Sequence, residues 1–197
     1  MSDRVANDDG APRPEDREAL GREVDRLLLE VARLQARVSE LEDLANNDPL
    51  VGLPNRRGFE AKLEQLIARV DRYGDEAAMV FVDMDGLKEI NDKFGHCAGD
   101  DALVEIGRML VASVRNSDCV ARLGGDEFGV LLERTDELSA WQMALRIVET
   151  VVGSEFCVAG SCLPLSVAVG VGTIKPGDTV KSVIQRADKE MYRVKAA

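Results

Sequence analysis

Two largely apolar runs, 118–123 and 128–133, are separated by only four residues in the stretch DCVARLGGDEFGVLLE. Both runs have the length and the composition of buried strands. A connection this short joins antiparallel neighbours, because parallel strands need a crossover of a dozen or more residues. The sequence therefore predicts a hairpin whose glycines allow a tight turn and bring Asp126 and Glu127 to its tip.

The rest of the chain alternates between helical and strand periods after residue 57. A chain of 197 residues suits one domain with a short appendage. Because part of the sheet is antiparallel, we predict an α+β fold. The expected helices are 57–72, 86–94, 99–114, 138–152 and 179–194, and the expected strands are 78–84 and 165–173, with a weak hairpin around 156–165.

Apolar residues recur at alternating spacings of four and three between residues 20 and 45, which is a heptad register. Valine at a with leucine at d favours a parallel two-stranded coiled coil, in which Arg37 at g meets Glu42 at e of the partner chain. A single amphipathic helix packed on its own domain is the alternative. The a positions are Val24, Val31 and Val38, and the d positions are Leu20, Leu27, Leu34 and Leu41.

Composition marks both ends of this heptad segment. Residues 1–15 contain Pro, Gly and acids with almost nothing apolar, which is typical of a disordered tail. The stretch NNDPLVGLPNRRGF carries two prolines and cannot continue a helix. We therefore expect a tail over 1–15, a coiled-coil dimerisation stalk over 16–45 and a globular domain over 46–197.

The charge and the hydropathy of the chain exclude several partners. A formal net charge of −11 and a pI near 4.7 argue against binding to nucleic acid or to an anionic membrane. No run of about 18 apolar residues and no signal-peptide pattern is present, so we expect a cytoplasmic protein. A phosphate ligand would need a metal or a local pocket.

The four cysteines form no CxxC pair, and His96 is the only histidine, which argues against a structural zinc site. Cys157 and Cys162 could face each other across the weak hairpin. A disulfide is not expected there, because the cytoplasm is reducing.

The strand AMVFVDM ends in a carboxylate, and period 2 places Asp83 and Asp85 on one face. A carboxylate at the end of a buried strand needs a partner. If the hairpin lies beside this strand, three or four of these carboxylates, from Asp83, Asp85, Asp126 and Glu127, converge, and a divalent cation would offset their repulsion. Oxygen ligands favour Mg²⁺ or Mn²⁺. The alternative from spacing alone is a polar hairpin tip with both acids in water.

Four motifs in order, from about Asp48 to Lys195, resemble the GGDEF family of diguanylate cyclases. They are DPLVGLPNRRGF, VDMDGLKEINDKFGHCAGDDAL, RLGGDEFGVLL and ADKEMYRVK. The resemblance implies a fold similar to nucleotidyl cyclases and to the polymerase palm, a ferredoxin-like mixed antiparallel sheet flanked by helices. It also implies condensation of two GTP molecules into cyclic di-GMP with release of two pyrophosphates.

The same resemblance assigns the metal site. Asp83, Asp126 and the backbone carbonyl of Met84 would hold two Mg²⁺ or Mn²⁺ ions per active site. Glu127 would be a further ligand or the base that takes the proton from the attacking 3′-hydroxyl. This chemistry is two-metal phosphoryl transfer.

Nucleotide contacts follow from the resemblance as well. Asn91 and Asp100 match the positions that read guanine, although without the resemblance both would be interpreted as helix caps. Lys88 and Lys195 match lysines that contact the triphosphate. Leu87 stands where the family commonly has Phe, so it would alter one wall of the nucleotide pocket. The sequence ends at VKAA, before the position of a triphosphate-binding arginine, which bears on GTP affinity.

Arg115 and Asp118 form RNSD, with five residues between this motif and Gly124, and match the family's inhibitory RxxD site. An arginine can clamp phosphate, and an aspartate can accept from guanine. Arg146 matches a secondary position contributed by a neighbouring domain. The cyclic product would bind here and inhibit synthesis.

Because each GGDEF domain binds one GTP, the reaction requires two facing domains, which the stalk would bring together as a homodimer. Input would come from an upstream regulatory protein, from stalk register or from the product. The alternatives are a catalytically weak or inactive cyclic di-GMP receptor that uses the RxxD site, and a structural coiled-coil adaptor.

Overall fold

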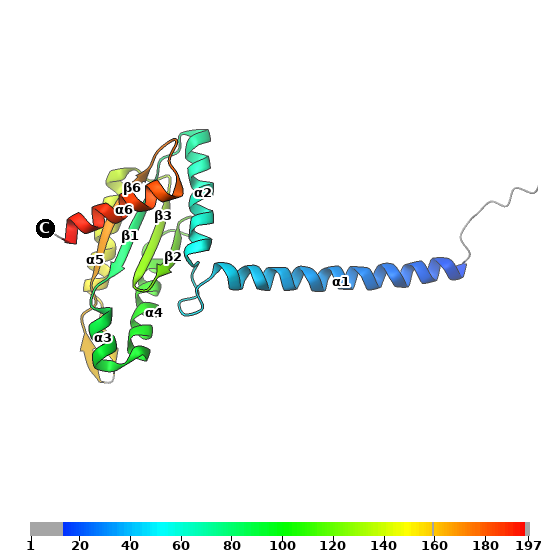
Figure 1. Cartoon of the computed structure of the whole chain (residues 1–197), viewed down its shortest axis with the longest axis horizontal. Coiled ribbons are helices and arrows are strands. Elements are labelled where there is room, and N and C mark those ends of the chain that lie inside the picture. The colour runs from blue at the N-terminus through cyan, green and yellow to red at the C-terminus, as the bar shows by residue number, and fades with distance from the viewer. Residues whose placement is uncertain (1–13, 159, 196–197) are drawn as a thin grey trace, which may run out of the picture. The chain divides into compact units, whose positions relative to one another are not determined.

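The computed structural model describes residues 14–158 and 160–195, which divide into two units at Asp43 and Leu44 (Figure 1). The first unit consists largely of the long helix α1 (Pro14–Asn46), which confirms the predicted stalk helix. The predicted tail lies outside the described residues up to residue 13, and its last two residues belong to α1. No described helix has the length and apolarity that crossing a bilayer requires.

The second unit is an α+β domain, as predicted. Its main sheet has the strand order β2-β3-β1-β6, and each of these pairings is antiparallel. The elements after α1 are α2 (Arg56–Tyr73), β1 (Ala77–Met84), α3 (Leu87–Phe94), α4 (His96–Ser113), β2 (Cys119–Gly124), β3 (Glu127–Glu133), α5 (Glu137–Val152), β4 (Phe156–Val158), β5 (Ser161–Leu163), β6 (Val167–Ile174) and α6 (Val180–Lys195).

Helices cover both faces of the sheet, and alternate residues of β1 divide between two cores. Ala78, Val80 and Val82 pack with α4 and α5. Ala77, Met79 and Phe81 pack with α2 and α6, which lie together on the other side of the sheet in Figure 1. Period 2 therefore points Asp83 toward the layer of α2 and α6.

Helix α6 lies very close to β6. A β-carbon at Gly170 would overlap the backbone of Ala187 and Met191, so only glycine lets the helix approach this far. Asp178 fixes the start of α6, because its carboxylate accepts from the Arg186 guanidinium at 2.7 and 2.9 Å. This close packing determines where the later residues of α6 reach the sheet edge.

The expectation of free thiols in the weak hairpin is wrong. β4 pairs with β5, Cys157 stands directly opposite Cys162, and the two side chains form a disulfide. The prediction relied on the redox state of the compartment, whereas cross-strand register brings the two sulfur atoms within bonding reach. Among the described cysteines, Cys97 and Cys119 are free.

Candidate active site

The end of β1 and the hairpin turn meet at one edge of the sheet. Asp83 is the direct antiparallel partner of Glu127, and the Met84 amide donates to the Asp126 carbonyl at 3.0 Å. In the turn, Gly125 adopts a φ of 44°, which confirms the predicted role of glycine there. Because Asp83 and Glu127 are paired residues, their side chains share the face covered by α2 and α6.

Lys195, at the end of α6, reaches this edge. Its Nζ lies 2.6 Å from Oδ1 of Asp83 and 3.1 Å from Oδ1 of Asp85. Burial opposes the charge of the ammonium, but the bonds to the two aspartates outweigh it and raise the pKa of Lys195. The structure thus joins a predicted triphosphate lysine to a predicted metal ligand.

Glu127 is held by Arg56, at the start of α2. Nη2 of Arg56 lies 3.2 Å from Oε2 of Glu127, and Nε donates to the Leu123 carbonyl at 2.9 Å. Partial burial raises the pKa of Glu127. Arg56 opposes this effect, whereas the charges of Asp83, Asp126 and Asp188 add to it. A carboxylate with a raised pKa is a suitable proton acceptor near neutral pH.

The sequence interpretation missed Arg56 and Asp188 as members of this site, and it placed Asp85 beside Asp83 without giving it a role. Asp85 shares its face with Asp83 by period 2, so its position was available from the strand pattern. Arg56 and Asp188 lie on helices distant in sequence. Only the packing of α2 and α6 over the sheet brings them to the acids.

The donor set fits a hard cation in part. Asp83 and Asp85 already converge on one positive group, the Lys195 ammonium, and carboxylate oxygens are suitable ligands for Mg²⁺. No group of three or more His, Cys, Asp or Glu side chains gathers around one point within the described residues. The site therefore supplies two convergent carboxylates, while the Glu127 side chain is engaged by Arg56.

Asn91 and Leu87 on α3 face Gly99 on α4, where an added β-carbon would overlap the Asn91 amide oxygen. Helix α4 begins at His96, three residues before the predicted start, so Asp100 is inside the helix and does not cap it. The cap interpretation of Asp100 is therefore wrong. Asp100 follows Gly99 directly and is exposed, and Lys88 is exposed on α3.

The RxxD motif forms a turn between α4 and β2. The carboxylate of Asp118 accepts from the Arg115 amide at 3.0 Å and from the Glu133 amide at 3.3 Å, while the Arg115 side chain is exposed. Arg146 on α5 donates to the Ser113 carbonyl at 2.9 Å, two residues before Arg115. Within one chain, Arg146 therefore lies beside the loop that carries Arg115 and Asp118.

A hollow of about 220 Å³ lies beside Asp118 and is lined by Lys62 and Arg69 of α2. Arg69 is held there by Glu133, with Nη1 2.6 Å from Oε2. Neither cation was predicted at this site, because each is an ordinary surface residue in the helical pattern of α2. Lys62 thus places a positive charge near the RxxD turn, whereas the charge of Arg69 is paired with Glu133 and, at 3.4 Å, with Asp75.

The segment between α1 and α2 is tied to the hairpin. Arg122 of β2 pairs with Asp48 at 3.3 Å and donates to the Gly125 carbonyl at 2.7 Å. The side-chain amide of Asn55 donates to the Ala45 carbonyl at 2.9 Å. The stretch that was predicted to end the stalk helix thus forms a loop that is hydrogen-bonded to the turn bearing Asp126.

A family profile described as "Diguanylate cyclase, GGDEF domain" matches residues 45–197. The chain belongs to the GGDEF family. The diguanylate cyclase TpbB of Pseudomonas aeruginosa is 37% identical over 89% of this chain and 42% of its own length. The response regulator PleD of Caulobacter vibrioides is 39% identical over 79% of this chain and 35% of its own length. The chain thus spans less than half of each of these two relatives.

Solved structures agree with the GGDEF fold. Diguanylate cyclase SiaD from Pseudomonas aeruginosa, in complex with its activator SiaC, is 31% identical, with a TM-score of 0.75 over 92% of this chain and 74% of that one. The coiled coil and GGDEF domain of DgcB from Caulobacter crescentus, with cyclic di-GMP, gives a TM-score of 0.83 at 24% identity, covering 90% of this chain and 95% of that one. The latter supports the fold alone.

Proposed function

We propose that this GGDEF protein condenses two GTP molecules into cyclic di-GMP. The observation that carries the proposal is the direct pairing of Asp83 with Glu127 at the sheet edge, beside the Lys195 ammonium. Acids and a lysine in this arrangement suit phosphoryl transfer, in which charge on a phosphate must be neutralised and a hydroxyl deprotonated.

Each residue then has a role in the reaction. Asp83, Asp126 and the Met84 carbonyl would hold two divalent cations, which would stabilise charge on the attacking and leaving oxygens. Glu127 accepts the proton of the 3′-hydroxyl or adds a ligand. Lys88 and Lys195 bind the triphosphate.

The base is recognised between α3 and α4. Asn91 and Asp100 read guanine there, because a carboxylate accepts from the guanine N1–H and amino group, which adenine does not present in this form. Leu87 lines the same pocket.

The stalk brings a second GGDEF domain, with its own GTP, to the first. The heptad leucines of α1 are exposed in the single chain, with Leu27 at 50% and Leu34 at 51%, and a parallel dimer would cover this seam. Two GGDEF domains on one stalk can then bring each 3′-hydroxyl to the other domain's GTP.

Product control would use the RxxD turn. The exposed Arg115 clamps a phosphate of cyclic di-GMP, Asp118 accepts from guanine, and Arg146 adds a charge from a neighbouring domain. An upstream protein that binds the stalk is a further input.

The decisive experiment incubates the purified chain with GTP and Mg²⁺ and identifies nucleotides by mass spectrometry. Cyclic di-GMP should form with the wild type and not with Asp83→Asn. If a dimeric wild-type protein makes neither cyclic di-GMP nor the linear dinucleotide but still binds cyclic di-GMP, the chain is a receptor.

The dimer is tested with two glutamate substitutions in α1. Leu27→Glu places a charge in the seam, whereas Leu29→Glu changes an equally apolar residue at f, outside the seam, which is 74% exposed. Only Leu27→Glu should lower activity at low protein concentration. Equal behaviour of both variants would argue against assembly through this heptad.

A further inference from the structure

Asp85 follows β1 directly, and the resemblance to the GGDEF family assigned it no role. One carboxylate oxygen, Oδ1, lies 3.1 Å from Nζ of Lys195, and the other, Oδ2, accepts from the Ser166 hydroxyl at 3.2 Å. The Asp85 carboxylate therefore links Ser166, which precedes β6, to Lys195 in the last turn of α6.

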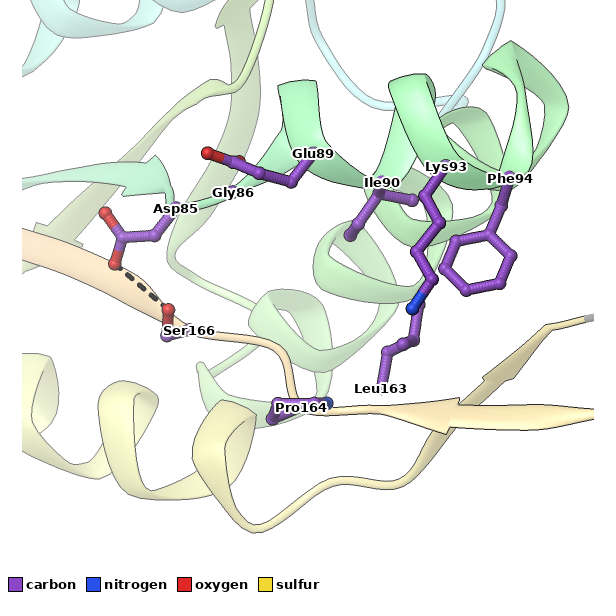
Figure 2. Close-up of a pocket in the computed structure, with 9 residues that line it drawn as sticks. All are labelled: Asp85, Gly86, Glu89, Ile90, Lys93, Phe94, Leu163, Pro164 and Ser166. Atoms are coloured by element: carbon purple, nitrogen blue, oxygen red, sulfur yellow. Dashed lines mark hydrogen bonds between the residues drawn. The ribbon is translucent and has the colours of Figure 1, made fainter.

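The backbone holds this arrangement in register. The Asp85 amide donates to the Ser166 carbonyl at 3.0 Å, so the two residues are joined by both main chain and side chain. The side-chain bond is drawn in Figure 2. An aspartate fixed twice by one neighbour has little rotamer freedom left, and its second oxygen stays directed toward Lys195.

Two lysines, Lys93 and Lys195, lie near Asp85, but only Lys195 forms an ion pair with it. Asp85, Ser166 and Glu89 border one end of a hollow of about 330 Å³, whose far end is formed by Phe94 and Lys93 (Figure 2). Lys93 is turned away over the Phe94 ring, with its Nζ 4.9 Å from the centroid. Among the ion pairs of the described residues, Asp85 pairs only with Lys195.

Lys195 also depends on this contact. Its Nζ is shared by Asp83 and Asp85, and its side chain is about one-third exposed, at 34%. If Asp83 turns to a divalent cation, as the proposed function requires, Lys195 loses its shorter contact. Asp85 then is the carboxylate that keeps the ammonium at the site.

We propose that Asp85, braced by Ser166, is a positioning residue that holds Lys195 at the sheet edge for the terminal phosphates of the nucleotide. The proposal rests on the proposed function for its ligand, a nucleoside triphosphate. Asp85 acts through Lys195. Removing the Asp85 carboxylate should make the Lys195 side chain more mobile and weaken phosphate binding, and it should leave guanine recognition unchanged.

A double-mutant cycle tests this coupling. Binding of α,β-methylene-GTP and of GMP is measured calorimetrically in Mg²⁺ for the wild type, Asp85→Asn, Lys195→Gln and the double variant. Asp85→Asn should weaken the triphosphate analogue about three- to tenfold, as expected for a half-exposed charged hydrogen bond. GMP affinity should stay the same, and Asp85→Asn should have no effect in the Lys195→Gln background.

Serine and charge controls complete the design. Ser166→Ala should weaken the analogue about twofold, and Ser166→Thr, which keeps the hydroxyl, should restore it. Glu149→Gln on the exposed side of α5 makes the same change in net charge and should leave both affinities unchanged.

Three results would overturn the proposal. These are an equal loss for GMP, an equal loss in the Lys195→Gln background, and an unchanged affinity for the triphosphate analogue in Asp85→Asn. The expected binding pattern in a protein that produces no cyclic di-GMP would instead refute the proposed synthesis and leave the positioning role of Asp85 in place.

Discussion

Arg56, at the first position of α2, donates to the carboxylate of Glu127 across the domain, with Nη2 3.2 Å from Oε2. The same guanidinium donates to the Leu123 carbonyl, so it holds both the strand before the turn and the acid after it. Arg56, which directly follows the loop between α1 and α2, is thus in contact with the proposed base Glu127.

Replacing Arg56 with Gln should shift the pH dependence of synthesis. Arg56 opposes the increase in the pKa of Glu127, so its loss lets that pKa rise further. If Glu127 must be deprotonated to act, the acidic limb of the rate profile moves to higher pH. Arg57→Gln, at the exposed neighbour, is the matched control. Identical acidic limbs in the two variants would show that Arg56 does not affect the pKa of Glu127.

Glu127→Gln should abolish synthesis and also stabilise the protein at neutral pH. Its folded-state pKa is raised, so native stability from this group declines as pH increases from the ordinary glutamate value through the raised value. Glutamine does not ionise, so the substitution removes this loss of stability at neutral pH. Activity should fall at least about 100-fold. Thermal unfolding should show a higher Tm than wild type at pH 7, with the gain shrinking toward pH 4; a loss of stability at pH 7 would contradict this account.

Asp178→Asn should loosen α6 and with it the position of Lys195. The Arg186 guanidinium, with bonds from Lys175 and Ser182, lowers the pKa of Asp178 to about 2. Because the folded-state pKa is depressed, this stabilisation is complete above about pH 4 and is lost as pH falls toward 2. We expect a loss of about 1–2 kcal/mol at pH 7 by urea unfolding.

Glu190→Gln provides the control in the same helix. Its partner Arg193 is 71% exposed, and such surface pairs contribute little. A comparable loss in both variants would mean that Asp178 does not specifically anchor α6.

Local pattern was sufficient for much of the fold. The heptad predicted α1, the four-residue connection predicted the β2–β3 hairpin, and period 2 placed Asp83 and Asp85 together. The packing of helices on the sheet determined the remaining site contacts, which local pattern does not specify. Arg56 and Asp188 reach the acids only because α2 and α6 cover the same face of the sheet, and helical spacing does not specify which face a helix covers.

Two wrong interpretations have the same origin. Asp100 was compatible with a cap only if α4 began late, and Gly95 and His96 start it earlier. The cysteine pair was judged by compartment, while the β4–β5 register decided its geometry. In both cases the boundary or register of a neighbouring element decided the outcome: the start of α4 at His96 excludes a cap at Asp100, and the β4–β5 register brings together two cysteines that are five residues apart.

Arg115→Ala should remove product inhibition and preserve basal synthesis. The Arg115 side chain is exposed, whereas its amide holds Asp118, so truncating the side chain leaves the turn intact. Cyclic di-GMP affinity, measured by calorimetry, should fall at least about tenfold for loss of a charged phosphate contact. Arg108→Ala removes another exposed arginine, in α4, and serves as the control. Wild-type product affinity in Arg115→Ala would refute the site.

The disulfide predicts a stepwise count of reactive thiols. In the native protein without reductant, only Cys97 should react rapidly with a thiol reagent, because Cys119 is buried and burial raises the pKa of its thiol. Denaturant should expose Cys119 and give two thiols, and prior reduction should give four because the Cys157–Cys162 bond opens. Four reactive thiols in denaturant without reduction would place both hairpin cysteines in the reduced state.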